Sequence, residues 1–286
     1  MKLVHISDIH IDANPILGSD PVENFKRCLA HVEHKHRDAD RVVITGDLTH
    51  YGDQASYERL AELLEASSLQ GNLNPRLLIG NHDDRETFAQ VLAPERDPNG
   101  FIQWSEDTGA SRFIYLDSVR DGSHEGQLCD DRLTWLSAEL SEAESAAKPV
   151  FLFMHHNPIT VGVPNADLIG LREQDAFHDV LKRHDGTVRH IFFGHCHYSL
   201  SGTLTPGAAS IGLSAPRSTN HPCWPEISGR RDRMGYSERL ERNYNVALIE
   251  PSSVVVHTID FHHEESVEWL EIDETGWIDE GIAATG

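Results

Sequence analysis

The stretch Lys-Leu-Val-His-Ile-Ser-Asp-Ile-His at residues 2–10 decides the fold, because a β-prone apolar run there ends on two polar side chains, Asp8 and His10. Buried parallel strands read as continuous apolar runs, and their carboxyl ends meet at one edge of an open sheet. Four further runs share this design: Arg41–Thr45 before Gly46-Asp47, Arg76–Ile79 before Gly80-Asn81-His82-Asp83, Val150–Met154 before His155-His156, and Val188–Phe193 before Gly194-His195-Cys196-His197. We therefore expect five strands that bring Asp, Asn and His side chains to one edge of an α/β structure.

The polar residues at that edge indicate a metal site. A single Asp or Asn after a strand is ordinarily a turn residue, but turns do not require the histidines of Asp-x-His, Asn-His and His-x-His. Carboxylate oxygens and imidazoles together suit two hydrolytic metal ions. Cys196 is expected to point away from its neighbours His195 and His197 in an extended segment. The absence of cysteine ligands disfavours a structural zinc site.

The order D-x-H, G-D, G-N-H-D, H-H and G-H-x-H over residues 8–197 resembles the signature of the calcineurin-like metallophosphoesterases. The sequence at Gly80–Asp84 and the chain length are most similar to the bacterial class III cyclic-nucleotide phosphodiesterases and their glycerophosphodiesterase relatives. The resemblance implies a four-layer α-β-β-α sandwich, in which two mixed sheets face each other and helices cover both outer faces. We expect this domain to occupy residues 1–263 and an acidic tail to occupy residues 264–286.

The resemblance also implies a ligand set and a mechanism. Asp47 would bridge the two ions, and hydroxide formed from metal-activated water would attack phosphorus. His82 would stabilise the transition state or protonate the leaving oxygen, so His82 and Asp47 are the predicted catalytic residues. Mixed coordination of this kind suits Mn, Fe, Zn or Co. The first ion would be held by Asp8, His10, Asp47 and His197, and the second by Asp47, Asn81, His155 and His195.

Several roles near these blocks have alternatives. Asp83 either orients His82 or caps a helix at Arg85–Leu92. His156 follows a ligand and is expected to support the site or to be structural, because adjacent residues of a strand point apart. Substrate contacts are predicted for Asn81, His82, His50, Arg217, His221 and Trp224, and the last two lie in a Pro-, Gly- and Arg-rich loop at residues 221–236.

The secondary-structure pattern predicts a β-α-β-α-β opening. Apolar spacing predicts helices at Pro21–His36 and Asp53–Ser67 between the first three strands. Strands are expected at Gly100–Trp104 and Arg112–Ser118, on either side of a turn. A helix at Asp130–Ser145 is expected to have Asp130 as its N-cap.

The composition excludes some classes of protein. The chain has 286 residues, 24 Lys and Arg against 46 Asp and Glu, and a formal net charge of −22, which disfavours nucleic-acid polymers as partners. No apolar stretch is long enough for a membrane span, and no signal-peptide pattern is present, so a cytoplasmic location is expected. The four cysteines are expected to be free thiols. A homo-oligomer stays possible.

The function expected from these features is hydrolysis of small phosphodiesters, either 3′,5′-cyclic nucleotides or glycerophosphodiesters. The alternative is a phosphomonoesterase or a phospholipid head-group hydrolase on the same scaffold. Arg85 is the one obvious cation near the blocks, with Arg217 further along the chain, and this scarcity favours diesters over dianionic monoesters. A non-catalytic binding scaffold is disfavoured, because no predicted ligand is missing.

Overall fold

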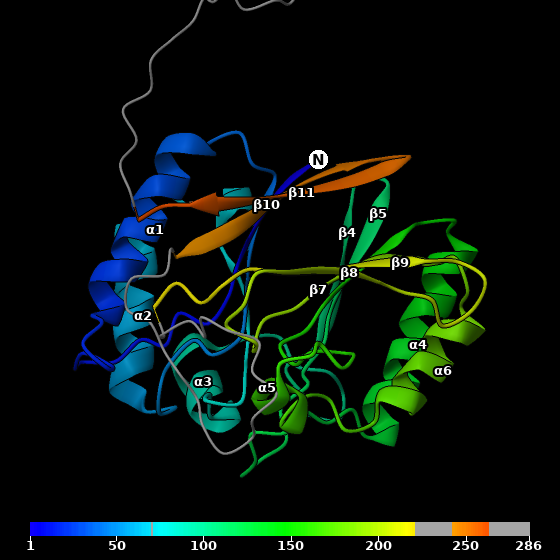
Figure 1. The fold of residues 1–286 in the computed structure, drawn as a ribbon, viewed down its shortest axis with the longest axis horizontal. Coiled ribbons are helices and arrows are strands. Elements are labelled where there is room, and N and C mark those ends of the chain that lie inside the picture. Colours follow the sequence, from blue (N-terminus) through cyan, green and yellow to red (C-terminus); the bar gives the residue numbers. More distant parts are fainter. Residues whose placement is uncertain (70, 221–241, 263–286) are drawn as a thin grey trace, which may run out of the picture.

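The computed structural model describes residues 1–69, 71–220 and 242–262. The predicted acidic tail, the loop at 221–236 and, with that loop, His221 and Trp224 lie outside the described residues. Two mixed sheets face each other, and helices cover their outer faces (Figure 1). This arrangement confirms the expected four-layer sandwich.

The first sheet has five strands in the order β11-β10-β1-β2-β3. Neighbours β1, β2 and β3 are parallel, with Val4 opposite Val42 and Val43 opposite Arg76. The β1–β10 and β10–β11 pairs are antiparallel. The strands are β1 (Lys2–Ile6), β2 (Arg41–Thr45), β3 (Arg76–Leu78), β10 (Asn243–Glu250) and β11 (Ser253–Asp260).

The second sheet has six strands in the order β4-β5-β6-β7-β9-β8. Its four central strands, β5, β6, β7 and β9, are parallel, and the outer strands β4 and β8 pair antiparallel to their neighbours. The strands are β4 (Trp104–Thr108), β5 (Ser111–Tyr115), β6 (Val150–Phe153), β7 (Val188–Phe192), β8 (Leu200–Leu204) and β9 (Ile211–Ala215).

The helices bury one apolar face each against a sheet. In α1, Phe25, Cys28, Leu29 and Val32 recur at helical spacing and pack on the outward side chains of β1 and β2. The first sheet is covered by α1 (Pro21–Lys35), α2 (Gln54–Ala66) and α3 (Arg85–Leu92), and the second by α4 (Asp130–Ser145), α5 (Pro164–Leu168) and α6 (Gln174–Arg183). A 3₁₀ turn, η1 (Gly71–Leu73), precedes β3.

An aromatic core joins the two sheets. Phe153 stacks on Phe192 with ring centroids 5.0 Å apart, and Phe113 and Tyr115 lie beside Phe153 at 5.1 Å each. The first sheet faces these rings with smaller apolar residues, Leu3, Val43, Leu78 and Ala247. Because side chains alternate along a strand, the neighbouring residues of β1 and β2 point outward to the helices instead.

Two local predictions were wrong. The expected strand at Gly100–Trp104 does not form: residues 100–103 are irregular, and β4 begins only at Trp104. The Asp97 carboxylate accepts a hydrogen bond from the Phe101 N–H at 2.8 Å, so a side chain takes the place of a strand partner for this backbone. Asp130 is the first residue of α4 rather than its N-cap, which is Cys129.

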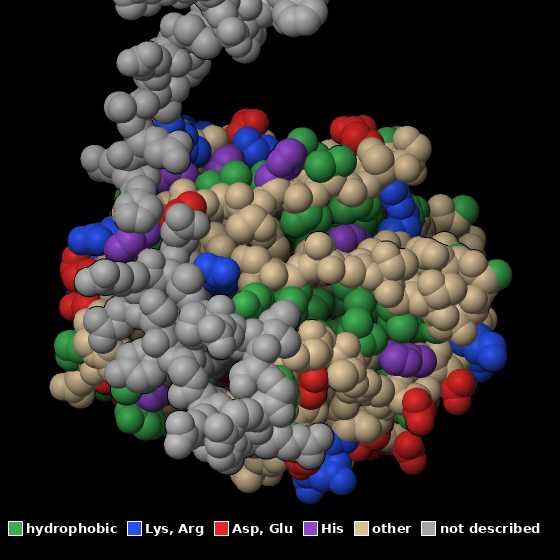
Figure 2. All heavy atoms as spheres, in the orientation of Figure 1, with side chains coloured by type: hydrophobic (Ala, Val, Ile, Leu, Met, Phe, Trp, Pro, Cys, Tyr) green, Lys and Arg blue, Asp and Glu red, His purple; other side chains and the backbone are tan. Residues whose placement is uncertain are grey.

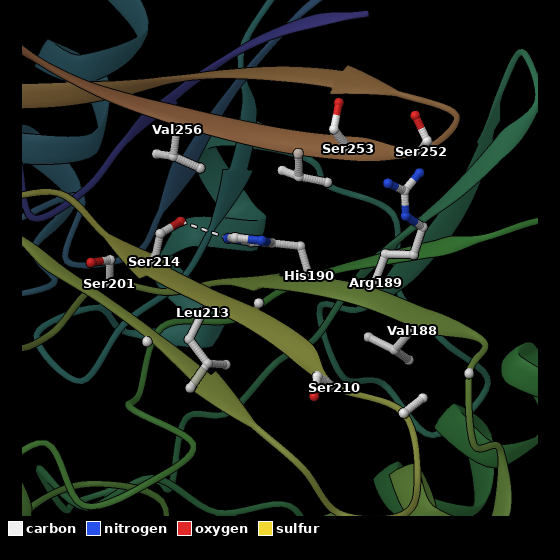
Figure 3. A pocket seen from close by; sticks show the side chains of 15 residues that line it. Val188, Arg189, His190, Ser201, Ser210, Leu213, Ser214, Ser252, Ser253 and Val256 are labelled. Atoms are coloured by element: carbon white, nitrogen blue, oxygen red, sulfur yellow. Dashed lines mark hydrogen bonds between the residues drawn. The ribbon is translucent and has the colours of Figure 1, made fainter.

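Two histidines face the space between the sheets. His190 on β7 is hydrogen-bonded through Nε2 to the Ser214 hydroxyl at 2.8 Å and lines a pocket of about 510 Å³ (Figure 3). His5 on β1 contacts Thr45 in the same way at 2.8 Å. Burial lowers the pKa of His190 to about 4 and that of His5 to about 3. Both imidazoles are therefore neutral at physiological pH.

These neutral imidazoles predict acid-sensitive stability. The unfolded chain binds a proton at each histidine near pH 6.5 whereas the folded chain does not, so stability falls as pH decreases from about 6.5 towards 4. We expect His190→Gln, which keeps a polar group near Ser214, to remove about 2–3 kcal/mol of the loss between pH 7 and 4.5. Urea denaturation of the metal-free protein at the two pH values measures this. The exposed His257→Gln should leave the loss unchanged, and an unchanged loss in His190→Gln would contradict the prediction.

Candidate metal centre

The carboxyl ends of β1, β2, β3, β6 and β7 bring all seven predicted ligands together. Backbone hydrogen bonds lock the first two loops to each other, because the Asp8 and His10 N–H groups donate to the carbonyl oxygens of Gly46 at 3.1 Å and Asp47 at 2.8 Å. The Gly194 N–H likewise donates to the His155 carbonyl oxygen at 3.0 Å. The sites therefore rest on strand ends that are fixed by the two sheets.

The first group of ligand atoms comes from Asp8, His10, Asp47 and His197. Their donor atoms all lie within 4.8 Å of one another, and all four residues are buried. His197 Nε2 is 3.1 Å from His10 Nε2 and 3.3 Å from Asp8 Oδ1. His10 Nε2 is 3.6 Å from Asp47 Oδ2. This group has the composition expected for the first ion.

The second group is formed by Asp47, Asn81, His155 and His195. Asn81 Oδ1 lies 3.0 Å from His155 Nε2 and 2.8 Å from His195 Nδ1. His155 Nε2 is 3.2 Å from Asp47 Oδ1. Asp47 thus presents Oδ2 to one group and Oδ1 to the other, as a carboxylate that bridges two ions must.

The backbone at the ligands is in an unusual conformation. Asp8, His10, Asp47, His195 and His197 all have positive φ, between 46° and 68°. Positive φ is uncommon for residues other than glycine, and such residues gather at functional sites. Gly46, at φ 87°, precedes Asp47 and packs so closely that an added Cβ would lie 2.9 Å from the Gly80 Cα atom. The chain therefore tolerates local strain in order to aim these side chains inward.

The ionisation of the side chains around Asp47 shows why the site suits cations. Burial opposes ionisation of Asp47, but the facing His155, His82 and His10 hold its pKa well below the usual range. Burial also opposes charging of His155, yet Asp47 and Asp8 raise its pKa to about 9. Burial and the neighbouring His156 and His155 lower the pKa of His195. A proton on His155 balances the buried carboxylates without ions, and a cation would replace that proton.

The donor set fits metal ions in detail. The His155 Nδ1–H donates to the Thr45 carbonyl oxygen at 2.8 Å, so the proton that a cation would replace lies on Nε2, the nitrogen that faces Asp47 and Asn81. Buried carboxylate and amide oxygens and imidazole nitrogens that converge in this way need a shared positive charge. The residues thus fit two ions of the borderline transition-metal type.

His82 and His50 lie together beside the first group. The His82 Nδ1–H donates to the His50 carbonyl oxygen at 2.9 Å, and the two rings stack with centroids 5.0 Å apart. The His82 backbone N–H also donates to Asp47 Oδ1 at 2.9 Å. His82 therefore has a fixed ring whose Nε2 is not used in this contact. The structure places the His50 ring beside those of His10 and His82.

Asp83 has a third role, and both of its predicted roles were wrong. Its carboxylate accepts hydrogen bonds from the backbone N–H groups of Gly80, Leu48 and Thr49 at 2.8–3.0 Å. Asp83 therefore ties the loop after Asp47 to the loop that carries Asn81. The N-cap of α3 is the next residue, Asp84, which accepts from the Thr87 N–H at 2.8 Å.

The two arginines considered for substrate binding differ in position. Arg85 is held by Asp117 at 2.8 Å and also pairs with Asp121, so its charge is already neutralised. Arg217 lies with its guanidinium 5.6 Å from the centroid of the Tyr198 ring. The Ser218 hydroxyl donates to the Asp8 carbonyl oxygen at 2.7 Å, which brings this segment to the metal centre.

The sequence did not single out His124, which lies at the rim of the second group. Its Nδ1 is 2.8 Å from Asn81 Nδ2, and its ring is 5.2 Å from that of His82. Asn81 and His124 also border a pocket of about 470 Å³. Only its place in the sequence could have pointed to His124. The residue follows β5, whose carboxyl end lies at the same edge of the sheet as those of β6 and β7.

Comparison with known proteins agrees with this architecture. The calcineurin-like phosphoesterase family model matches residues 1–199. A probable cyclic nucleotide phosphodiesterase from Rhodopseudomonas palustris is 37% identical over 272 residues, which cover 92% of this chain and 94% of that protein. A glycerophosphodiester phosphodiesterase from Enterobacter lignolyticus is 32% identical over 206 residues, or 69% of this chain and 71% of that protein.

A solved structure extends the likeness to the fold. The crystal structure of a dimetal phosphatase from Danio rerio superposes with a TM-score of 0.67 at 13% identity and covers 91% of this chain and 96% of that one. The chain belongs to the calcineurin-like phosphoesterase family. It is a metal-dependent phosphoester hydrolase, which confirms the predicted enzyme class, and its clustered ligand residues agree with the predicted two-ion cofactor.

The shared carboxylate predicts coupled loss of both ions. We expect the purified protein to bind two transition-metal ions per chain, and chelation to abolish hydrolysis. Asp47→Ala should weaken both sites, whereas Asn81→Ala should weaken only the second. Because the ion-free His155 keeps its proton up to about pH 9, binding should tighten as pH rises from 7 to 9. Titration of metal-free protein with Mn²⁺ measures the stoichiometry, the effect of each substitution and the pH dependence, and an activity assay after chelation measures the loss of hydrolysis. Full activity without metal would overturn the assignment.

Proposed function

We propose that this protein hydrolyses small phosphodiesters, with 3′,5′-cyclic nucleotides as the preferred class and glycerophosphodiesters as the nearest alternative. The observation that carries the proposal is the division of the Asp47 carboxylate, with one oxygen directed to each ligand group. Relatives named as cyclic nucleotide and glycerophosphodiester phosphodiesterases support the substrate class.

Each ligand keeps its predicted assignment in this proposal. When bound, two such ions activate water and neutralise phosphate oxygens. Asp47 joins the two ion sites and is itself held by the His82 N–H. Asn81 contributes a neutral oxygen to the second group. Asp8, His10 and His197 complete the first site, and His155 and His195 complete the second.

His82 is the proposed donor of a proton to the leaving oxygen. A carbonyl oxygen only accepts hydrogen bonds, so His82 Nδ1 must carry the proton that it donates to the His50 carbonyl oxygen. His82 Nε2 can then bind and release a second proton. Stacking on His50 restrains the ring plane. We propose that His50 also contacts substrate, since it is half-buried and flanks both His10 and His82.

The charges of the described residues favour a monoanionic diester. Arg85, the arginine beside the motif blocks, is bound to Asp117 and Asp121 and is unsuited to a dianionic phosphate. Arg217 is the proposed substrate cation, because the segment that carries it meets Asp8. His221 and Trp224 keep their predicted role as substrate contacts, although they lie outside the described residues.

The net charge bears on which partners the protein can bind. On the face shown in Figure 2, Lys and Arg side chains are scattered rather than gathered, and the net charge is −22. We propose that nucleic-acid polymers are not substrates. No helix in the described ranges is long and apolar enough to cross a membrane. We propose a cytoplasmic location and a single domain over residues 1–263.

The role of His82 can be separated from that of the ligands. We expect His82→Ala to keep both ions bound but to lower kcat by about 10²–10⁴, the usual contribution of a positioned acid or base. The loss should shrink for substrates with a better leaving group, because these need no protonation. Metal content and kcat on two esters of different leaving-group pKa provide the measurement. Loss of metal from His82→Ala would contradict the assignment.

The substrate class predicts a preference between two model esters. We expect kcat/KM for bis-(p-nitrophenyl) phosphate to exceed that for p-nitrophenyl phosphate with the same metal at the same pH. The dianionic monoester can bind both ions tightly and leave slowly, and Arg85 is not available to recognise it. Assays with 3′,5′-cyclic AMP and glycerophosphoethanolamine then distinguish the two diester classes. A clear preference for the monoester would favour the phosphomonoesterase alternative.

A further inference from the structure

A hydrogen bond outside the ligand set engages the side-chain amide of Asn81. A carboxamide has an acceptor oxygen and a donor nitrogen of nearly equal size, so its orientation depends on its partners. Asn81 Oδ1 faces His155 and His195, and Asn81 Nδ2 faces His124 Nδ1 at 2.8 Å. A neutral imidazole accepts at Nδ1 only when its proton is on Nε2, and this tautomer matches the donor on Asn81.

The loop that carries His124 is anchored beside the second ion site. Ser118 and Gly126 bracket this loop, and both contact His156, the residue after the ligand His155. The Ser118 hydroxyl lies 2.8 Å from His156 Nδ1 and accepts from the His156 N–H at 3.3 Å. Gly126 packs on the same ring, where an added Cβ would lie 2.7 Å from the His156 Cβ atom.

The outer part of the loop is braced as well. The Gly126 N–H donates to the Gly170 carbonyl oxygen at 3.1 Å, and Val119 pairs with Gly126 across the loop. Glu125 next to His124 accepts from Arg120 at 2.6 Å and from Arg172 at 2.8 Å. His124 is exposed, but its backbone is held on both sides. Its ring is therefore presented to Asn81 by a restrained loop.

We propose that His124 is a positioning residue that holds the Asn81 oxygen towards the second ion and so sets the affinity of that site. The inference rests on the proposed ligand role of Asn81. A neutral amide oxygen binds a cation less strongly than a carboxylate does, so this site depends on pre-orientation more than the first site. Partners that orient a ligand in this way typically change metal affinity about 10–100-fold.

The test measures Mn²⁺ binding to the metal-free protein rather than activity. His124→Ala removes the acceptor, and we expect the dissociation constant of the weaker ion to rise about 10-fold while that of the tighter ion stays constant. His124→Asn places an amide oxygen near the position of Nδ1 and should restore most of the affinity. The exposed His257→Ala serves as the matched control and should change neither constant.

The same His124→Ala substitution in an Asn81→Asp variant separates the orientation of the residue 81 side chain from other effects of His124. In Asn81→Asp the carboxylate has two acceptor oxygens and needs no orientation, so adding His124→Ala should leave Mn²⁺ affinity unchanged there. An equal loss in both backgrounds, or no loss in either, would overturn the role of His124. If Asn81→Ala itself leaves both dissociation constants unchanged, the ligand assignment is wrong and the inference fails with it. If Asn81→Ala weakens the second site but His124→Ala does not, only the inference about His124 fails.

Discussion

The buried carboxylate of Asp47 is the constraint on which the rest of the catalytic edge depends. A charge removed from water is costly unless it is paired and hydrogen-bonded. Here one oxygen faces His10, and the other faces His155 and the His82 N–H. The two ligand groups are electrostatically coupled, because the negative charge of Asp47 belongs to both.

The scaffold keeps the two ligand groups rigid because the residues that pack the core lie on the strands, whereas the ligands lie just beyond the strand ends. The aromatic layer between the sheets holds the strands, and the ligands come only after the strands end. The strained backbone at Asp8 and Asp47 is compensated by hydrogen bonds between their two loops. Asp83 extends the same bracing to the Asn81 loop, so three consecutive strand ends behave as one unit.

The sequence predicted what is encoded locally. Each ligand follows a recognisable apolar run, and the strand ends of a parallel sheet share one edge, so the metal centre and the two-sheet architecture could be inferred from pattern and resemblance. The role of Asp83 could not, because its partners Leu48 and Thr49 are 34–35 residues away. The apolar pattern at Gly100–Trp104 resembles that of a strand, but the Asp97 carboxylate binds this backbone instead. His124 belongs to no motif. Contacts set by loop conformation leave little trace in composition or periodicity.

The left-handed backbone at the ligands also determines which replacements the chain can tolerate. Asn and Asp adopt positive φ more readily than other residues with side chains. At Asp8 and Asp47, exchange for Asn therefore removes a charge and keeps the backbone, whereas exchange for a β-branched residue adds conformational strain. On the proposed assignment of these two carboxylates as ligands, a single exchange for Asn would abolish hydrolysis and leave the sandwich folded, and such variants would serve as inactive forms for capturing bound substrate.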